Sequence, residues 1–383
     1  MEFLPSPRPT VGIELELQLL DAHSLDLKNG IIPLIQLFPN RTDVKAEFIQ
    51  SSVEINSPVC DSTSDAEQHL RQTLTGLKER CESLGMTLCG AGTHPFATHL
   101  ALITPSPRYL RMKSEFGITG RNQLTFATHV HVGVPSGDMA VFVMRHLTPC
   151  VPLLLAISAN SPFWRGHDTG YAAYRQCLLA ASQSYGLPPY FTGWADFLRF
   201  FRMSQRAQIF SCLRDIHWDL RPHPDFGTLE LRVMDAASTI HAAVAQAAFA
   251  RSLIVYLMEH ADSGLDDWPL VCLPRWIELM NRYEASHRAL AARYVVDEAG
   301  HVRPMRELIA ALLQLVTPVA ERIGEAQGLR SLRSLLEEGA GYERQRRVFE
   351  SAKHYQALVR HLADGLEQEL LDASESQHMA APD

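Results

Sequence analysis

Four short segments of the chain alternate between apolar and polar residues, and this alternation constrains the fold more than any other feature. The first segment, residues 11–21, reads VGIELELQLLD. Successive side chains of a β-strand point to opposite faces of the sheet. The segment therefore predicts a strand with one apolar face and one polar face. The polar face carries Glu14, Glu16 and Gln18, with the two carboxylates roughly 6.5–7 Å apart.

Three further segments, 51–58, 127–134 and 227–235, have the same design. Their apolar faces are rich in valine, isoleucine and leucine, and their polar faces carry Glu54, Asn56, His129, His131, Glu230 and Arg232. A solvated face of an antiparallel sheet is the ordinary explanation for such alternation. We favour a face that lines a cavity, because these polar positions include no lysine. They carry instead the groups that bind metal ions, carboxylates and phosphates.

The position of Glu47 relative to these strands is ambiguous. Glu47 lies seven residues before Glu54, and in one unbroken strand this odd separation would place the two side chains on opposite faces. They converge only across a turn or bulge near Ser51 and Ser52, or over two turns of helix. Spacing alone leaves both arrangements open.

The polar faces indicate a particular kind of metal site. Several carboxylates with one imidazole and no cysteine make a hard, oxygen-rich ligand set, which suits Mg²⁺ or Mn²⁺ better than zinc. Mg²⁺ held by a few carboxylates usually completes its shell with substrate phosphates. The chain has no GxxxxGK[ST] loop, and GAGTHP at 90–95 lacks the third glycine of a dinucleotide loop. If ATP binds, metal ions and arginines must hold it.

The bulk composition excludes several classes of protein. The chain has 383 residues, of which 46% are hydrophobic and 20% charged, and its net charge of −8 advertises no basic face for nucleic acid. Its seven cysteines are scattered without a CxxC pair, which indicates reduced thiols. The start, MEFLPSPRPT, does not read as a signal peptide, and the apolar stretch 141–159 is interrupted by Arg145 and His146. We expect a cytoplasmic protein with no membrane partner.

The order of elements indicates one α+β domain over residues 1–371. Residues 1–235 are rich in strands apart from a helix expected over 64–85, whereas residues 236–371 are helical in pattern. Helices are predicted over 240–260, 274–295, 304–324, 329–338 and 342–371, and Pro318 is expected to kink or divide its helix. Strands followed by helices predict helices packed around an antiparallel sheet. Residues 372–383 are expected to be a disordered tail.

Six segments of the chain together carry a family resemblance: GIELELQLLD, EFIQSSVEI, HVHVG, SANSPFWRGHDTGYAAYR, WDLRPHPDFGTLELRVMD and ERQRRVFE. They resemble the glutamate–cysteine ligase type 2 family, the YbdK-like carboxylate–amine ligases, over residues 10–371. RPHPDFGTLELRVMD and HVHVG are the specific parts of this match. The resemblance implies a glutamine-synthetase-type catalytic fold, in which an antiparallel, funnel-like sheet surrounded by helices binds ATP and several Mg²⁺ ions.

The resemblance also assigns roles to residues. It implies that the metal ligands are Glu14, Glu16, Glu47, Glu54, His131 and Glu230, so the position of Glu47 is settled by resemblance and not by spacing. Arg232 would stabilise the transferring phosphoryl group, and Arg175 and Arg221 are candidates for binding a substrate carboxylate or phosphate. Since one histidine of HVHVG is sufficient, His129 is expected to be structural, as is His94. His287 stands where relatives favour asparagine, which leaves the acceptor amine open.

The implied activity is ATP-dependent carboxylate–amine ligation, with weak glutamate–cysteine ligase activity. Glutamate would be converted to γ-glutamyl phosphate, and an amine would then attack to give an amide, ADP and phosphate. The expected partners are these small molecules, with a homodimer as the candidate assembly. Two alternatives stay open: a metal-dependent amide hydrolase that uses the same carboxylates, and a nucleotide or metal sensor without turnover.

Overall fold

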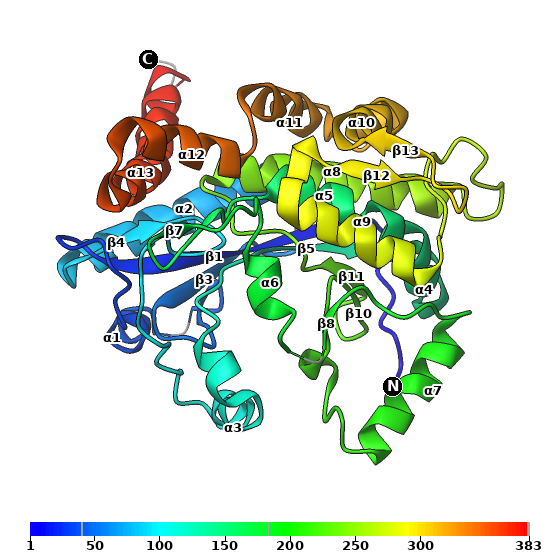
Figure 1. Cartoon of the computed structure of the whole chain (residues 1–383), viewed down its shortest axis with the longest axis horizontal. Helices are drawn as coiled ribbons and strands as arrows, with labels where there is room; N and C mark the ends of the chain where they lie inside the picture. The colour runs from blue at the N-terminus through cyan, green and yellow to red at the C-terminus, as the bar shows by residue number, and fades with distance from the viewer. Residues whose placement is uncertain (40, 183, 381–383) are drawn as a thin grey trace.

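The structure, a computed structural model, describes residues 1–39, 41–182 and 184–380, and for residues 372–380 the backbone alone. At the centre of this part of the chain is a seven-stranded sheet with strand order β10-β11-β5-β1-β3-β2, in which β4 also pairs with β1 (Figure 1). Every pairing in it is antiparallel. Its strands are β1 (Val11–Asp21), β2 (Val44–Ala46), β3 (Ser52–Asn56), β4 (Met86–Cys89), β5 (Thr128–Gly133), β10 (Leu220–His223) and β11 (Thr228–Leu231).

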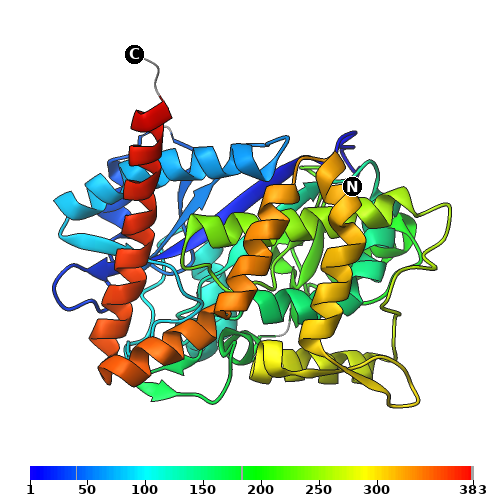
Figure 2. The ribbon, with the colours of Figure 1, turned by 90° about the horizontal axis from the view of Figure 1, so that it is seen from above.

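The apolar face of this sheet packs on helices. Ile13, Leu15 and Leu17 of β1 are buried, as the alternation predicts. The helices α2 (Thr63–Ser83) and α8 (Ile240–Glu259) contact β1 on this side. Figure 2 shows α10 (Met305–Arg322) and α11 (Ala326–Glu338) lying over α8, which is therefore buried between the sheet and an outer helical layer.

Two apolar helical stretches of the described chain, 137–158 and 240–259, are long enough to cross a bilayer. The first consists of α4 (Gly137–Leu147), η1 (Thr148–Cys150) and α5 (Val151–Ser158), and the second is α8. In the folded protein, 83% of the apolar part of the first stretch and 94% of that of the second are buried. Both stretches therefore form part of the protein core.

The opposite, polar face of the sheet is covered by shorter elements. In Figure 1, α3 (Pro107–Arg121) and α6 (Arg175–Leu179) lie on the side of the sheet away from α8. The remaining short elements between α5 and β10 are β6 (Phe163–Trp164), β7 (His167–Asp168), β8 (Tyr185–Gly186), α7 (Trp194–Arg206), η2 (Leu213–Asp215) and β9 (His217–Trp218). α1 (Ile31–Gln36) precedes β2.

Three helix predictions differ from the structure in their extent. The helix expected over 274–295 ends early: α9 (Arg275–Arg288) is followed by η3 (Ala289–Ala291) and by β12 (Arg293–Val295), which pairs with β13 (Val302–Pro304). Ala289 has a φ of 45°, which ends the helix. The helix expected over 342–371 is divided into α12 (Gly341–Ala352) and α13 (Tyr355–Ala380) by the left-handed backbone of Lys353. α10 continues through Pro318.

The α+β prediction is confirmed, with helices packed around an antiparallel sheet. One hydrophobic cluster joins the two halves of the chain and extends from Val11 to Leu366. α13 continues over residues 372–380, where a disordered tail was expected, whereas 381–383 lie outside the described residues.

Candidate active site

The register of the sheet gathers the polar residues of four strands onto one face. On β5, His129 lies opposite Glu14 of β1, and His131 lies opposite Glu230 of β11. On the other side of β1, Glu16 lies opposite Glu54 of β3. Residues directly opposite each other in an antiparallel pair share a face, with Cβ atoms about 4.5–5.5 Å apart. The sheet therefore places these carboxylates and imidazoles in one continuous polar surface.

Glu47 joins the same surface through a hairpin. β2 pairs with β3 so that Lys45 lies opposite Glu54, and the chain then turns through residues 47–51 into β3. Glu47 is two residues beyond Lys45 and so falls on the same side. Of the two arrangements that the spacing left open for Glu47, the structure therefore has the turn. The same hairpin brings Lys45 to the polar face, and this residue was not predicted from the sequence.

A cavity of about 450 Å³ lies over this face. Its walls come from the sheet, from α3 and α6, and from the segments around β8 and β9. The lining includes each predicted site residue and several others: Glu14, Glu16, Lys45, Glu47, Glu54, Arg108, Tyr109, His129, His131, Arg175, Gln176, Tyr185, Arg214, His217, Asp219, Arg221, His223, Phe226, Glu230 and Arg232.

One end of the cavity holds three carboxylates that repel one another. Burial raises the pKa of Glu16 to about 7, with Glu54 adding to the effect and Arg175 opposing it. Burial also raises the pKa of Glu47 well above its usual range, and Glu54 and Glu16 raise it further. The pKa of Glu54 is raised for the same reasons, burial first and then the charge of Glu14. Lys45, whose Nζ lies 3.4 Å from the Glu54 carboxylate, opposes the rise in the pKa of Glu54 but does not cancel it.

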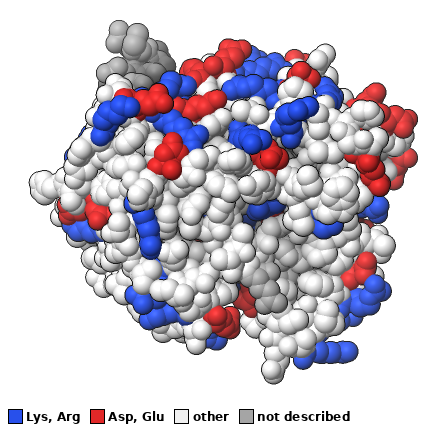
Figure 3. All heavy atoms as spheres, viewed as in Figure 1, with Lys and Arg blue, Asp and Glu red and all other residues white. Residues whose placement is uncertain are grey.

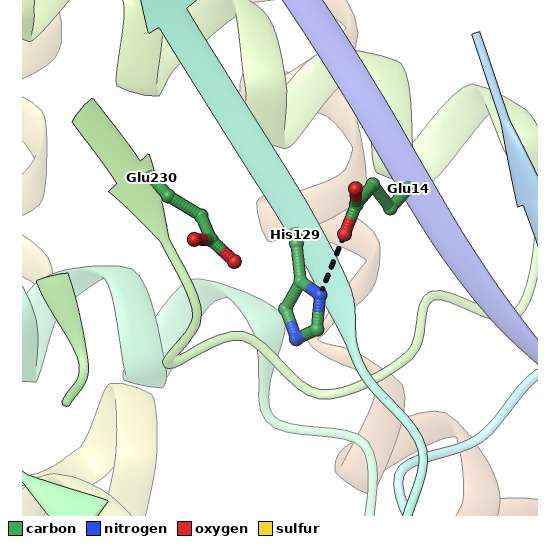
Figure 4. Close-up of side chains that lie close together, drawn as sticks. All are labelled: Glu14, His129 and Glu230. Carbon is green, nitrogen blue, oxygen red and sulfur yellow. Dashed lines mark hydrogen bonds and ion pairs between the residues drawn. The ribbon is translucent and has the colours of Figure 1, made fainter. Parts of the chain in front are cut away.

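A second group lies beside it, formed by Glu14, His129 and Glu230 (Figure 4). One ligand atom from each of the three residues falls within 4.8 Å of the others. Nδ1 of His129 is 3.1 Å from a carboxylate oxygen of Glu14, and the Glu230 carboxylate points toward the same space. Burial alone would raise the pKa of Glu14, but His131 and His129 hold it well below its usual range.

His131 lies at the edge of this second group. Its Nδ1 is hydrogen-bonded to the Thr228 hydroxyl at 3.1 Å. Its Nε2 faces Glu14 at 3.5 Å and Glu230 at 3.9 Å, and it has no hydrogen-bond partner among the described residues. A ring nitrogen fixed by a bond at its other nitrogen and aimed at carboxylates has the arrangement of a metal ligand.

His129 is the functional candidate that the sequence interpretation set aside as structural. Among the described residues, the two groups with metal-binding geometry are Glu14 with His129 and Glu230, and Glu16 with Glu54 and His129. Only His129 belongs to both. The strand alternation held the signal, because it placed both histidines on the polar face. The donor set of carboxylates and imidazole fits a divalent cation of the Mg²⁺ or Mn²⁺ kind.

The arginines divide into two kinds. Arg221 and Arg232 both pair with the buried carboxylate of Glu230, Arg221 through Nε at 2.8 Å and Arg232 through Nη1. Although burial would raise the pKa of Glu230, these two cations hold it well below its usual range. Nε of Arg232 has no hydrogen-bond partner among the described residues. Arg232 therefore presents an unused donor beside the second group.

Arg175 has a different set of partners. Its guanidinium donates to the backbone carbonyls of Val233 at 3.2 Å, Met234 at 3.3 Å and Arg232 at 3.3 Å. It also lies 3.7 Å from the carboxylate of Asp235. Arg175 lines the cavity, but its bonds hold the segment after β11 that carries Arg232.

Asp219 and Tyr185 are two of the cavity-lining residues that were not predicted from the sequence. Asp219 precedes Arg221 by two residues, and its carboxylate accepts from Nε of Arg282 on α9 at 2.7 Å. Tyr185 on β8 stacks on His217 with ring centroids 4.9 Å apart. Asp219 could have been found from its spacing to Arg221, whereas Tyr185 lies in a two-residue strand without a pattern of its own.

The comparison with known protein families decides what this chain is related to. The model of glutamate–cysteine ligase family 2 matches residues 10–362, which is most of the chain. The chain belongs to this family.

Curated relatives agree with the family assignment. A Trichormus variabilis protein provisionally named glutamate–cysteine ligase 2 is 44% identical over 380 residues, covering 99% of this chain and 98% of the relative. A protein of the same provisional name from Thermobifida fusca is 34% identical over 355 residues, covering 91% of this chain and 88% of the relative. The family resemblance expected from the sequence is thus confirmed, and with it a ligase of the glutamate–cysteine type.

Solved structures of low sequence identity share the fold of this family member. A bifunctional glutathione synthetase from Pasteurella multocida superposes with a TM-score of 0.70 at 13% identity; the match covers 95% of this chain and 53% of that longer one. A glutamate–cysteine ligase from Francisella tularensis, solved in complex with AMP, gives a TM-score of 0.65 at 12% identity and covers 97% of this chain and 90% of that one. At these identities the likeness concerns the fold alone.

Proposed function

We propose that this family member is an ATP-dependent carboxylate–amine ligase that joins the γ-carboxylate of glutamate to an amine, with cysteine as the first acceptor to test. The observation that supports this most is the pair of acidic groups on one sheet face, sharing His129 and flanked by Arg232. The family assignment supports the ligase class, and the AMP complex of the Francisella tularensis ligase supports nucleotide binding on this fold.

The acidic groups are the proposed sites for Mg²⁺ or Mn²⁺. Glu16, Glu47 and Glu54 would hold one ion, and Glu14, Glu230 and His131 would hold another, with His129 within reach of both. Ions bound there would neutralise the β- and γ-phosphates of ATP. The raised pKa values of Glu16, Glu47 and Glu54 support this assignment, because a cation would offset both the burial and the neighbouring negative charge that raise them.

Arg232 is the proposed catalytic cation for phosphoryl transfer. Its guanidinium is anchored by Glu230, its side chain lines the cavity, and its buried Nε has no hydrogen-bond partner among the described residues. The substrate carboxylate oxygen attacks the γ-phosphorus, ADP leaves, and an acyl phosphate forms. A fixed cation that faces the transferred group stabilises the charge that develops on it. Arg221 supports this geometry through the shared carboxylate of Glu230.

The second half of the reaction requires a dry, crowded site. The amine nitrogen attacks the acyl carbon and forms the amide bond, phosphate leaves, and the amine loses its proton. Water would compete with the amine for the acyl phosphate. The burial of Glu54, His129 and Glu230 at 5%, 3% and 1% exposure indicates that the floor of the cavity is shielded from solvent.

The direct test is Mg²⁺-dependent phosphate release from ATP in the presence of glutamate and a panel of amino acids and amines. The proposal predicts release that requires both a carboxylate and an amine, and that is lost in Glu14→Ala and Glu230→Ala. Glu337→Ala, which removes an exposed carboxylate from α11, is the matched control and should keep full activity. Release of phosphate without any amine, or amide hydrolysis without ATP, would contradict the proposal.

A further inference from the structure

Five arginines line the cavity, and two of them have no acidic partner among the described residues. Three of the five pair with buried carboxylates of the chain itself. The other two are Arg108 and Arg214. A cation that lines a polar cavity without a counter-charge from the protein has its charge available for a ligand. These two residues are therefore where the cavity would attract a further anion.

The two arginines meet across the cavity. Nη2 of Arg108, at the start of α3, donates to the backbone carbonyl of Arg214 in η2 at 2.8 Å. On the α3 side, the hydroxyl of Thr104 donates to the backbone carbonyl of Glu47, next to β2, at 2.6 Å. On the η2 side, Nη1 of Arg221 in β10 donates to the carbonyl that directly follows η2, at 2.7 Å. Since β2 and β10 are at opposite ends of the strand order, the contact between Arg108 and Arg214 bridges the cavity over the polar face of the sheet.

Both side chains keep donors that the described chain does not use. Nε of Arg108 is buried and has no hydrogen-bond partner among the described residues. Its guanidinium lies over the ring of Tyr109, with Cζ 5.5 Å from the ring centroid, which stabilises this position. The exposed side chain of Arg214 makes no hydrogen bond or ion pair with any residue that the structure describes. A guanidinium binds a carboxylate through two parallel hydrogen bonds, so an external carboxylate would satisfy these donors.

Basic residues also surround the approach to this bridge. α3 carries four basic residues and one acidic residue, and α7, which precedes η2, carries three and one. Figure 3 shows lysine and arginine side chains over both helices, in the lower half of the view. The whole chain has a net charge of −8, so this excess is local. Local positive charge raises the concentration of anionic ligands near it.

We propose that Arg108 and Arg214 bind a carboxylate of an amino-acid substrate that does not react. The proposal rests on the proposed ligase function of the same cavity, in which the acidic groups and Arg232 serve the phosphates and the reacting carboxylate. Glutamate and an acceptor such as cysteine each bring one further carboxylate, which requires cations of its own. The pair of arginines thus selects amino acids over substrates that lack this carboxylate.

The first test measures binding without turnover. Glutamate, and separately cysteine, is titrated calorimetrically into the full chain with Mg²⁺ and ADP. Arg108→Gln and Arg214→Gln should each weaken the affinity for one of these amino acids by about 10–100-fold, the usual cost of losing a hydrogen bond to a charged group. Arg214→Gln keeps the test independent of folding, because that side chain contacts no described residue. Arg111→Gln, which removes an exposed arginine of α3 outside the cavity lining, should bind as wild type does.

Steady-state kinetics identifies which substrate carries the bound carboxylate. If it is glutamate, both variants should raise KM for glutamate, whereas KM for 4-aminobutyrate, which lacks the α-carboxylate, should stay at its wild-type value. If it is the acceptor, the same contrast should hold between cysteine and cysteamine. KM for ATP should be unchanged in either case.

Three results would overturn the proposal: wild-type affinity for both amino acids in both variants, a wild type that binds neither amino acid, or a KM that rises for ATP alone. Failure of the proposed ligase function would look different. In that case the variants would still weaken amino-acid binding, but the wild type would form neither phosphate nor amide.

Discussion

At the scale of single residues, a substitution of Arg232 should affect turnover without affecting the binding of ATP. We expect Arg232→Lys to lower kcat by about 10²–10³-fold, the usual cost of losing one preorganised donor to the transition state. KM for ATP should change little, because the acidic groups and their cations would still hold the nucleotide. Steady-state kinetics with saturating glutamate measures both constants. Arg199→Lys, at a side chain 80% exposed on α7, is the control. A rise in KM with unchanged kcat would show that Arg232 serves ground-state binding instead.

His94 sets one part of the pH dependence of stability. It is fully buried, Nε2 donates to the carbonyl of Leu25 at 2.9 Å, and Nδ1 accepts from the backbone N–H of Ala97 at 3.0 Å. Burial lowers its pKa to about 4. In the unfolded chain the pKa of a histidine is about 6.5. Between about pH 6.5 and 4 the unfolded chain therefore binds a proton that buried His94 does not, so the free energy of unfolding falls as the pH is lowered through this range.

His94→Gln should remove this part of the pH dependence. The slope of the free energy of unfolding between pH 4 and 6.5 should fall by about 1.4 kcal/mol per pH unit. Denaturant unfolding at several pH values measures the slope, with His167→Gln on the exposed β7 as control. An unchanged slope in His94→Gln would contradict the role of His94.

The sequence predicted those site residues whose position follows from the alternation of apolar and polar residues along one strand. It did not predict contacts between residues that are far apart in the chain. The polar faces of β1, β3, β5 and β11 follow from period-two spacing, and the structure brings their side chains to one cavity. Arg175 lines the cavity, but its bonds to the carbonyls of residues 232–234 depend on contacts across 57 to 59 positions of chain. Likewise, no local pattern of α9 indicates that Arg282 reaches Asp219.

At the scale of elements, Glu325 joins three helices. Its carboxylate, 1% exposed, accepts from the backbone N–H of Thr63 at the start of α2 and pairs with the buried Arg251 of α8. Glu325 itself lies directly before α11. Glu325→Leu should lower the free energy of unfolding by about 3–5 kcal/mol, because Arg251 would stay buried without its partner. Adding Arg251→Met to this variant should recover much of the loss.

Denaturant titration of these variants measures the effect. The control is Glu259→Leu, which breaks the exposed pair with Arg322, with side-chain exposures of 39% and 53%, and which should cost less than about 1 kcal/mol. Equal losses in Glu325→Leu and Glu259→Leu would show that the buried pair does not connect the helices as described.

The sequence predicted which segments form helices more accurately than where those helices end. Strongly periodic segments such as α2 and α8 match their predicted ranges within two residues. The end of α9 was missed because alanine is a strong helix former, whereas Ala289 has a positive φ in the structure. The division between α12 and α13 was missed because lysine rarely adopts the left-handed backbone that Lys353 has.

At the scale of the whole molecule, divalent cations should stabilise the fold. Burial raises the pKa of Glu16 to about 7, so its contribution to stability is present at low pH and lost as pH rises through 7. At pH 8 the metal-free protein therefore holds an unfavourable ionised carboxylate. Adding Mg²⁺ should raise Tm by a few degrees, equivalent to about 2.7 kcal/mol at a hundredfold excess over Kd. The rise should be larger at pH 8 than at pH 6.

Glu16→Gln separates this account from a general salt effect. The variant should have a higher metal-free Tm at pH 8 than wild type, because the buried charge is gone, and a smaller rise on adding Mg²⁺. Glu337→Gln, on the surface of α11, should match wild type in both respects. Differential scanning calorimetry with matched ionic strength measures both quantities. A lower metal-free Tm in Glu16→Gln, with an unchanged response to Mg²⁺, would exclude Glu16 as a ligand.

The central claim is that a substrate carboxylate is activated by phosphorylation, and oxygen transfer tests it most directly. Glutamate labelled with ¹⁸O in its γ-carboxylate is turned over with ATP, Mg²⁺ and the best amine, and the phosphate released is analysed by mass spectrometry. An acyl phosphate requires that each phosphate released carries one ¹⁸O atom from the carboxylate. Phosphate without label, formed at the same rate as amide, would show that the carboxylate oxygen never bonds to phosphorus and would contradict the account.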